Sequence, residues 1–198
     1  MDTAPTRKQL THDRIVDTAA RVLRETGFHG VGVADIMKRA GLTHGGFYAH
    51  FPSREVLLAE ALERAGQDSR LRLERSIAAR EAKGASRLRA LLESYLSEAH
   101  LKAVDSGCPV AALASEMPRQ GEAVREAGQV RVESLLAAVA AALPPGHPEG
   151  SAGIVAAQMV GALQIARALG DNASGRRQLA AARQFLLEQF ESPRPAGR

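Results

Sequence analysis

Apolar side chains recur at intervals of three and four residues along most of the chain, which is the spacing of one face of an α-helix. The first such face consists of Ile15, Val16, Ala19, Ala20 and Leu23. Thr11 precedes it as the expected N-cap, and Gly27 follows it as a residue that tolerates positive φ at a helix end. No stretch alternates between apolar and polar residues in the manner of a half-buried strand. The pattern predicts an all-α protein.

Two short helices and a longer one are predicted next. The first spans residues 33–40, and Thr43 caps a second that ends before Pro52. Ser53 then caps a longer helix, whose apolar face weakens after the polar residues 67–70. That weakening indicates a helix that bridges two domains.

The remaining sequence predicts further helices bounded by glycine and proline. Helical spacing is clearest over residues 88–99. A short helix begins at Pro109 and ends near Met117, because Pro118 disfavours helical geometry in the residue before it. Longer helices are predicted over residues 124–143, 151–169 and 174–190, with Gly170 closing the second of them. The chain should therefore contain about nine helices.

Residues 33–51 match the pattern of a helix-turn-helix, in which two short helices meet at a glycine turn. Ala40 is small enough to let the helices cross, Gly41 suits the sharp turn, and Leu42 anchors the turn in the core. The second helix presents its N-terminal end where such proteins read base edges, with residues Thr43, His44, Gly45 and Gly46. Each glycine costs a helix about 1 kcal/mol relative to alanine, so a purely structural helix would seldom carry both.

Charge distribution agrees with a DNA-binding role for the N-terminal region. Residues 1–54 carry eight Lys and Arg against five Asp and Glu, whereas the rest of the chain carries 18 against 17. The sequence therefore predicts a DNA-binding domain over residues 1–54 and a larger helical domain over residues 55–191. Residues 192–198 are expected to form a mobile tail. Double-stranded DNA is the partner that a basic head of this kind suits.

The TetR family of transcriptional repressors has an N-terminal DNA-binding domain that this sequence resembles over the run G-F-x-G-V-x-V-A-D-I-M-K-R-A-G-L-T-x-G-G-F-Y-x-H-F-P-S-R-E. The resemblance covers about residues 11–65, and the remainder agrees only in helix number and length. It implies a three-helix DNA-binding head, a larger helical ligand-binding body and a homodimer. Two departures stand out: Gly32 and Val33 occupy the usual Thr or Ser cap of the second helix, and His44 replaces a basic residue, which makes its charge pH-dependent.

The resemblance also implies roles for individual residues of the head. Tyr48 and His50 match the residues of the family that contact phosphate, and Arg54 matches a contact to the DNA backbone at the start of the fourth helix. Residues 43–46 match the base-reading edge. Lys38 lies close enough to the motif to neutralise a phosphate. Phe47 and Phe51 are expected in the core.

The last two helices are implied by the same resemblance to pair in a four-helix dimer interface. Two apolar stripes with small residues fit this role, although burial within one chain would explain the same pattern. The candidate interface residues are Ile154, Met159, Ala162, Ile165, Leu169, Leu179, Ala182, Phe185 and Leu186. The operator of such a dimer should be near-palindromic, because its two heads bind about one duplex turn apart.

The family resemblance implies that a small-molecule inducer bound in the body releases the protein from DNA. The sequence gives little indication of which molecule that is. Candidate lining residues are Tyr95, Leu113, Met117 and Gln158, although an apolar stripe is more often plain core. Cys108 is a second candidate sensor, because it precedes Pro109 at the start of a short helix whose first amides can stabilise a thiolate. A thiolate there would react with oxidants or electrophiles, and a small buried cysteine is the alternative.

Several other classes of protein are disfavoured. A single cysteine cannot form an intramolecular disulfide or a cysteine-based zinc cluster, and the sequence indicates no metal and no cofactor. No nucleophile elbow, phosphate-binding loop or dinucleotide fingerprint is present, so no catalytic residue is expected. No secretory signal is visible, and the most apolar stretch, residues 154–169, is interrupted by polar side chains. These features predict a cytoplasmic protein that does not span a membrane.

The patterns together favour a homodimeric, sequence-specific repressor that a small molecule or a thiol-reactive signal releases from its operator. A general or architectural DNA-binding protein without an inducer is the alternative, distinguished by the ratio of specific to non-specific binding. A helical interaction module is a third possibility, and it requires that duplex DNA bind no better than a neutral polymer.

Overall fold

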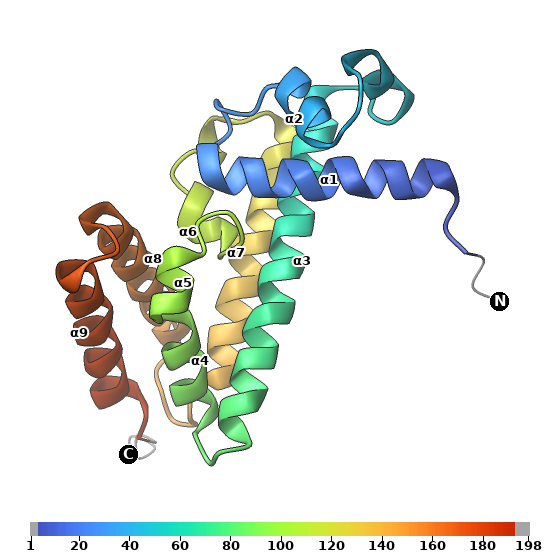
Figure 1. Ribbon diagram of the computed structural model, residues 1–198. Coiled ribbons are helices and arrows are strands. Elements are labelled where there is room, and N and C mark those ends of the chain that lie inside the picture. The colour runs from blue at the N-terminus through green and yellow to red at the C-terminus, as the bar shows by residue number, and fades with distance from the viewer. Residues whose placement is uncertain (1–3, 193–198) are drawn as a thin grey trace. The chain divides into compact units, whose positions relative to one another are not determined.

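The protein is all-α in a computed structural model that describes residues 4–192 (Figure 1). Within that range the chain forms nine α-helices and two short 3-10 helices, with no strand. The predicted fold class and helix number are therefore confirmed. All of the predicted tail except Ser192 lies outside the described residues.

The contacts divide the chain into two compact units. The first contains Met1–Asp68 and Asp105–Val130, and the second contains Ser69–Val104 and Arg131–Arg198. The predicted division into domains of residues 1–54 and 55–191 stays a prediction, because packing units and functional domains are different divisions. Residues 105–130 pack in the same unit as the helix-turn-helix although they follow it by more than fifty positions.

Helix α1 (Arg7–Thr26) begins five residues earlier than its predicted N-cap at Thr11 allows. The true N-cap is Thr6, whose side chain accepts a hydrogen bond from the backbone of Gln9 while the Gln9 side chain accepts one from Thr6. Thr11 lies inside the helix, where its hydroxyl donates to the carbonyl of Arg7. Gly27 ends the helix with φ of 72°, as predicted.

Helix α2 (Val33–Arg39) and the 3-10 helix η1 (His44–Ala49) form the predicted helix-turn-helix. Gly41 makes the turn with φ of 69°, a conformation that glycine adopts without strain. The second helix was predicted to be α-helical, and it is instead a 3-10 helix. The segment is short and contains two adjacent glycines, which weaken the α-helix, and the tighter 3-10 pattern is common in such short pieces.

Helix α3 (Arg54–Glu81) starts at the predicted cap, where the Ser53 hydroxyl accepts a hydrogen bond from Val56 N at 3.2 Å. It continues without a break through the polar residues 67–70. The predicted helix over residues 88–99 is interrupted, and α4 (Arg87–Tyr95) and α5 (Glu98–Lys102) replace it. The break follows from Ser97, whose hydroxyl caps α5 by accepting from His100 N at 3.1 Å.

Helix α6 (Pro109–Leu113) begins at the predicted proline but ends earlier than Met117. Pro118 lies within the 3-10 helix η2 (Met117–Arg119), at a starting position where a missing amide hydrogen costs nothing. Helix α7 (Glu122–Ala142) follows. The core of the first unit gathers Phe28, Phe47 and Phe51 with aliphatic side chains from α1, α2 and α3, and with Leu113, Met117 and Val124.

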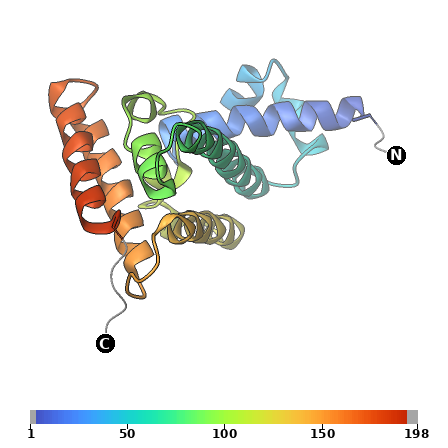
Figure 2. The ribbon, with the colours of Figure 1, turned by 90° about the horizontal axis from the view of Figure 1, so that it is seen from below.

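Helices α8 (Ser151–Leu169) and α9 (Ala173–Phe190) pack side by side in the second unit (Figure 2). Gly170 closes α8 with φ of 93°, as predicted. The Asn172 side chain caps α9, which begins one residue before the predicted start at residue 174. A Cβ atom on Gly175 would lie 2.2 Å from the carbonyl oxygen of Gly170, so only glycine permits this approach. The two helices are therefore held close at one end.

Helix α8 is also the one described helix that is long and apolar enough to cross a membrane by length and composition. That test is weak evidence, because helices of a water-soluble core pass it too. Here Arg167 of α8 donates hydrogen bonds to the carbonyl oxygens of His100 and Ala103, at 2.9 and 3.0 Å. The helix is thus part of the second unit, packed on α9 and α5.

Candidate DNA-binding and effector sites

The N-terminal edge of η1 is open to solvent. Thr43, His44 and Gly45 are exposed, Gly46 is half-buried, and Lys38 is exposed on α2. Tyr48 has 72% of its surface exposed, an unusual value for a tyrosine. Of the residues that the sequence predicted to face DNA, Thr43, His44, Gly45, Tyr48 and Lys38 are thus accessible to solvent.

Buried aromatic rings support this edge from beneath. Phe47 is buried and packs edge-on against Tyr48, with ring centroids 5.1 Å apart, and it stacks on Phe51 at 5.6 Å. Both phenylalanines lie in the core, as predicted. The alternation of Phe47 inward and Tyr48 outward fixes which side of η1 is presented.

His50 is half-buried at the end of η1, and its Nδ1 atom has no hydrogen-bond partner among the described residues. Burial lowers the pKa of His50, and the nearby cationic groups His12 and Lys8 lower it further. The ring of His12 lies 6.3 Å away and stacks on Phe51 at 4.5 Å. A neutral His50 can still donate a hydrogen bond to a phosphate, and an approaching phosphate would favour its charged form.

Arg54, which the family resemblance matches to a contact with the DNA backbone, makes hydrogen bonds within the chain. Its Nε donates to the carbonyl oxygen of Val31 at 3.0 Å, and its guanidinium also donates to the carbonyl oxygen of Phe28. Two of its five N–H donors are thus engaged by the loop between α1 and α2. Among the neighbouring cations, Arg39 is paired with Asp35 and Glu25, at 2.8 and 3.4 Å.

The adjacent glycines of η1 are not required by packing within the chain. A Cβ atom on Gly45 would meet nothing within 4 Å, and one on Gly46 would make only ordinary contacts, with Met37 Cε at 3.7 Å. Neither residue has positive φ. The missing side chains therefore leave open space on the exposed edge itself.

The candidate effector residues do not gather in one unit. Cys108, Leu113 and Met117 are buried in the first unit, whereas Tyr95 is buried and Gln158 is exposed in the second. Cys108 stands at the N-cap of α6 with Pro109 behind it, as predicted, and only 6% of its surface is exposed.

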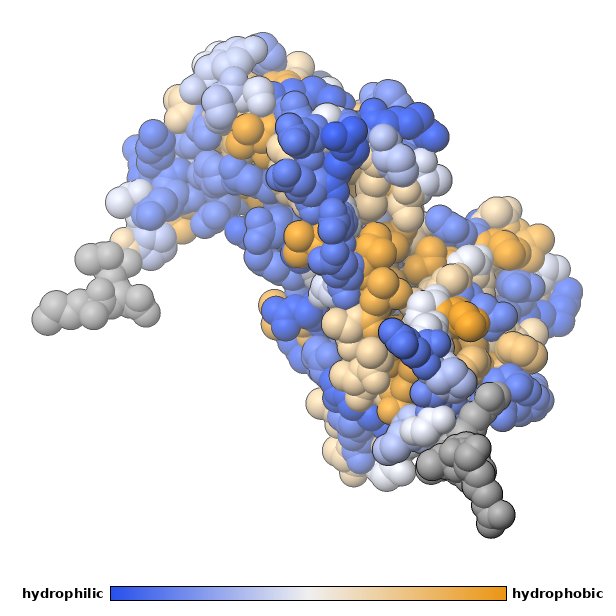
Figure 3. Space-filling view, turned by 180° about the vertical axis from the view of Figure 1, so that it is seen from behind, coloured by the Kyte–Doolittle hydropathy of each residue, from blue (hydrophilic) through white to orange (hydrophobic). Residues whose placement is uncertain are grey.

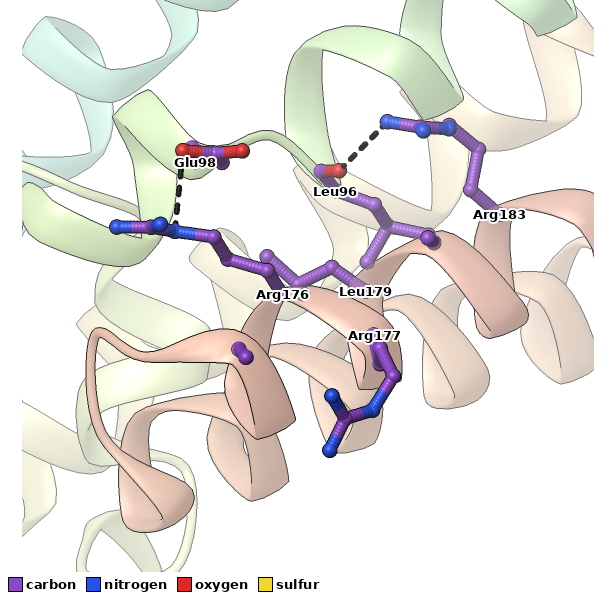
Figure 4. A pocket seen from close by; sticks show the side chains of 8 residues that line it. Leu96, Glu98, Arg176, Arg177, Leu179 and Arg183 are labelled. Atoms are coloured by element: carbon purple, nitrogen blue, oxygen red, sulfur yellow. Dashed lines mark hydrogen bonds and ion pairs between the residues drawn. The ribbon is translucent and has the colours of Figure 1, made fainter.

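A pocket that the sequence did not reveal lies in the second unit between α9 and the junction of α4 and α5 (Figure 4). Its volume is about 320 Å³, and its lining is Leu96, Glu98, Ala173, Arg176, Arg177, Leu179, Ala180 and Arg183. Arg176 pairs with Glu98 at 3.1 Å, and Arg183 donates to the Leu96 carbonyl oxygen at 3.2 Å. The sequence feature that could have indicated this pocket is the seven-residue spacing of Arg176 and Arg183, which places both on one helix face two turns apart. None of the predicted effector residues lines this pocket.

Four of the candidate interface residues form an exposed apolar surface on α8 and α9. Between 46% and 59% of the surface of each is exposed, and they are Ile154, Ile165, Leu169 and Phe185. Figure 3 shows apolar surface on this part of the molecule. Four others are buried within the chain itself, namely Met159, Ala162, Leu179 and Leu186, while Ala182 is half-buried. The predicted stripes thus divide into an inner and an outer face.

An all-α chain that exposes one edge of a helix-turn-helix has the architecture of a helix-turn-helix DNA-binding protein. A family model described as bacterial regulatory proteins, tetR family, matches residues 15–61. A second model, described as tetracyclin repressor-like, C-terminal domain, matches residues 84–182, which is half of the chain. The chain belongs to the TetR family of transcriptional regulators.

Similar proteins include other regulators. An HTH-type transcriptional regulator of Mycobacterium tuberculosis is 29% identical over 167 residues, which cover 78% of this chain and 83% of that protein. The HTH-type transcriptional repressor NemR of Escherichia coli is 26% identical over 137 residues, 69% of each chain.

Solved structures show the same fold over nearly the whole chain. A TetR-family regulator from Agrobacterium tumefaciens aligns with a TM-score of 0.74 and 26% identity, covering 93% of this chain and 99% of that one. The reduced form of Escherichia coli NemR aligns with a TM-score of 0.75 and 21% identity, over 93% and 99%. The family resemblance in the sequence is therefore confirmed.

Proposed function

We propose that this protein is a homodimeric repressor that binds a near-palindromic operator and is released from it by a small molecule or a thiol-reactive signal. The observation that carries the proposal is the accessible edge of η1, on which Thr43, His44 and Tyr48 project from a buried aromatic base. The similar protein NemR is itself named as a repressor. Catalysis has no part in the proposal, and the cytoplasm, where the operator lies, is the proposed location.

In this proposal, residues 43–46 contact the base edges, and phosphate groups are contacted by Tyr48, His50 and Lys38. A phenol hydroxyl and an imidazole N–H at the end of η1 are donors of the kind that position a recognition helix on the duplex backbone. His44 adds a donor at the position nearest the bases. Open space at Gly45 lets the backbone approach the groove closely.

Dimerisation uses the outer face of α8 and α9. The four exposed residues Ile154, Ile165, Leu169 and Phe185 form an apolar surface of the kind that marks an interaction site. A two-fold dimer presents two heads about 34 to 36 Å apart, or a multiple of that distance, which matches successive major grooves.

Selection of bound sequences from a random duplex pool tests the proposal with the full chain. The expected product is a near-palindromic site whose affinity exceeds that of unrelated duplex by at least about a thousandfold. The logarithm of the affinity should fall linearly with the logarithm of salt concentration. Equal affinity for all duplexes would favour the general DNA-binding protein instead, and an asymmetric minimal site would contradict the dimer.

The same operator serves to test the signal. N-ethylmaleimide should release the wild-type protein from DNA and leave the Cys108→Ser variant bound, because only the thiol at the start of α6 can be alkylated. Equal release of both proteins, or of neither, would remove the thiol-reactive branch and leave a small-molecule inducer.

A further inference from the structure

The peptide groups on both sides of Phe28 are held by side chains of opposite charge. The N–H of Phe28 donates to Oε2 of Glu116 at 2.9 Å, and the carbonyl oxygen of Phe28 accepts from the guanidinium of Arg54. The Nε of Arg54 also donates a hydrogen bond to the carbonyl oxygen of Val31 at 3.0 Å. Two side chains thus fix the loop that joins α1 to α2. Hydrogen bonds to charged groups are stronger than those between neutral groups.

The Glu116 carboxylate is seated directly against the backbone at the end of α1. A Cβ atom on Gly27 would lie 2.5 Å from its Oε1, a distance that real contacts do not show. Gly27 has φ of 72°, a backbone conformation that favours glycine at this position. The side chain of Phe28 is buried in the core below.

The loop is packed into the core through the side chains of Phe28 and Val31, but the helix that follows it lacks a side-chain cap. Helix α2 starts at Val33, two residues after the Arg54 contact, and its N-cap Gly32 offers no side-chain cap. A missing cap costs a helix about 1 kcal/mol and allows its first turn to fray. The hydrogen bonds that Arg54 donates and that Glu116 accepts order the loop just before this uncapped helix start.

Glu116 reaches the head from the other part of the sequence. It lies between α6 and η2, within the stretch that matches the C-terminal family model, yet it packs in the same compact unit as α1 and α2. A second close approach involves the same stretch: a Cβ atom on Gly121 would lie 2.1 Å from Oε1 of Glu55 on α3. The stretch is therefore closely packed against the head at two places.

We propose that Glu116 and Arg54 are positioning residues for DNA binding, which clamp the Phe28 peptides and thereby set the orientation of the helix-turn-helix on α1 and α3. Arg54 contributes by bonding to backbone carbonyl groups of the loop and not by contacting a phosphate. Glu116 connects the C-terminal part of the sequence directly to the DNA-binding head. The proposal rests on the proposed function in that it requires an operator. It assigns an effect on affinity to an acidic residue that cannot itself attract DNA.

The sign of the effect separates this proposal from simple electrostatics. Removing a negative charge near DNA should strengthen binding or leave it unchanged. Loss of the clamp should weaken it instead. Glu116→Ala removes the acceptor of the Phe28 N–H, Glu116→Gln keeps a neutral acceptor, and Glu126→Ala removes the same charge from an exposed position on α7.

Operator affinity of the full-length variants tests the clamp. Glu116→Ala should bind about tenfold more weakly than wild type, Glu116→Gln should fall between them, and Glu126→Ala should bind at least as tightly as wild type. Equal affinities of Glu116→Ala and Glu126→Ala would overturn the proposal. So would equal losses in the alanine and glutamine variants, because keeping an acceptor for the Phe28 N–H would then make no difference.

The salt dependence of binding tests the role of Arg54. Arg54→Ala should bind more weakly than wild type with an unchanged salt slope, whereas Lys38→Ala, which removes a proposed phosphate contact, should flatten it. A contact to one phosphate contributes about 0.9 to the slope, or roughly 2 for the two heads of a dimer. A decrease of that size in the salt slope of Arg54→Ala would show instead that Arg54 contacts a phosphate.

Hydrogen exchange provides a readout that needs no DNA. The amide of Phe28 should exchange at least about tenfold faster in Glu116→Ala than in wild type, while amides in the middle of α8 keep their rates. Unchanged exchange at Phe28 would overturn the clamp even if no operator were found. Failure of the wild-type protein to select any operator would count against the proposed function alone.

Discussion

His100 shows how one buried side chain acquires a pH dependence. Its Nδ1 lies 2.7 Å from the carbonyl oxygen of Tyr95, and its ring packs edge-on against the Tyr95 ring at 4.7 Å. The pKa of His100 is lowered from 6.5 to about 4, chiefly because burial disfavours the charged imidazole more than its hydrogen bond to Tyr95 favours it. The positive charges of Arg167 and Arg72 lower it further. At neutral pH the imidazole is therefore uncharged and donates one hydrogen bond to the backbone.

The free energy of unfolding should fall as the pH drops below 6.5. Between that pH and about pH 4, His100 binds a proton in the unfolded chain but stays neutral in the folded chain, because its pKa there is about 4. The loss is about 1.4 kcal/mol for each pH unit in that window, and it is absent above it. Urea unfolding of wild type and His100→Gln at neutral pH and at about pH 5 should show a smaller loss in the variant, by roughly 2 kcal/mol. Identical pH dependence in both proteins would show that His100 is protonated in the folded state.

The 3-10 helix η1 shows how an element can be shaped for contact rather than for stability. Gly45 and Gly46 weaken it, and neither is required by the packing of the chain, because a Cβ atom at Gly45 would meet open space. The residues that do stabilise the segment, Phe47 and Phe51, point inward. Local stability is therefore lost on the one edge where we propose that the backbone approaches DNA.

Gly45→Ala should separate stability from DNA binding. Alanine should leave the thermal stability of the free protein unchanged or raise it, by up to about 1 kcal/mol, because it restricts the unfolded chain without a clash. Operator affinity should fall at least about tenfold, since the new methyl group stands between the backbone and the groove. Gly153→Ala on α8, where a Cβ also meets nothing within 4 Å, is the matched control and should keep full affinity. Full affinity of Gly45→Ala would place the glycines outside the interface.

At the scale of the whole molecule, the proposed dimer places the outer face of α8 and α9 between two copies of the chain, so that face would determine whether one head or two bind DNA. This face is apolar on a helix pair whose inner face is already buried, with Met159 and Leu186 inside and Ile165 and Phe185 outside. Burial of apolar surface contributes about 25 cal/mol for each Å² removed from water. A second copy of the chain is the partner that a two-fold operator requires.

A charge placed on this outer face should separate the dimer. Phe185→Arg should sediment as a monomer at micromolar concentration, where wild type sediments as a dimer, because the charge cannot be desolvated in an apolar interface. Its operator affinity should fall together with its salt slope, since a single head makes half of the phosphate contacts. Leu71→Arg, at an equally exposed leucine on α3, serves as the control and should remain dimeric. Monomeric wild-type protein, or a dimeric Phe185→Arg, would contradict the interface.

Local patterns in the sequence were sufficient for most helices and for the motif that identifies the family. Helix periodicity, the turn at Gly41 and the end of α8 at Gly170 depend on interactions within three or four positions, which a linear sequence displays. The same holds for the aromatic pair Phe47 and Tyr48, whose opposite orientations follow from their adjacent positions on one helix. Helix boundaries were less secure, since either Thr6 or Thr11 can cap α1 and only the capping box with Gln9 distinguishes them.

Tertiary structure alone decided which half of each apolar stripe is buried and what Arg54 and Glu116 contact. Glu116 is separated from Phe28 by 88 positions, and no periodicity relates the two. Their contact depends on how α6 and η2 pack against the end of α1, which is set by the shapes of many side chains at once. The sequence by itself thus determined that this protein is helical and carries a DNA-binding motif. Only the fold determined which distant residues hold that motif in place.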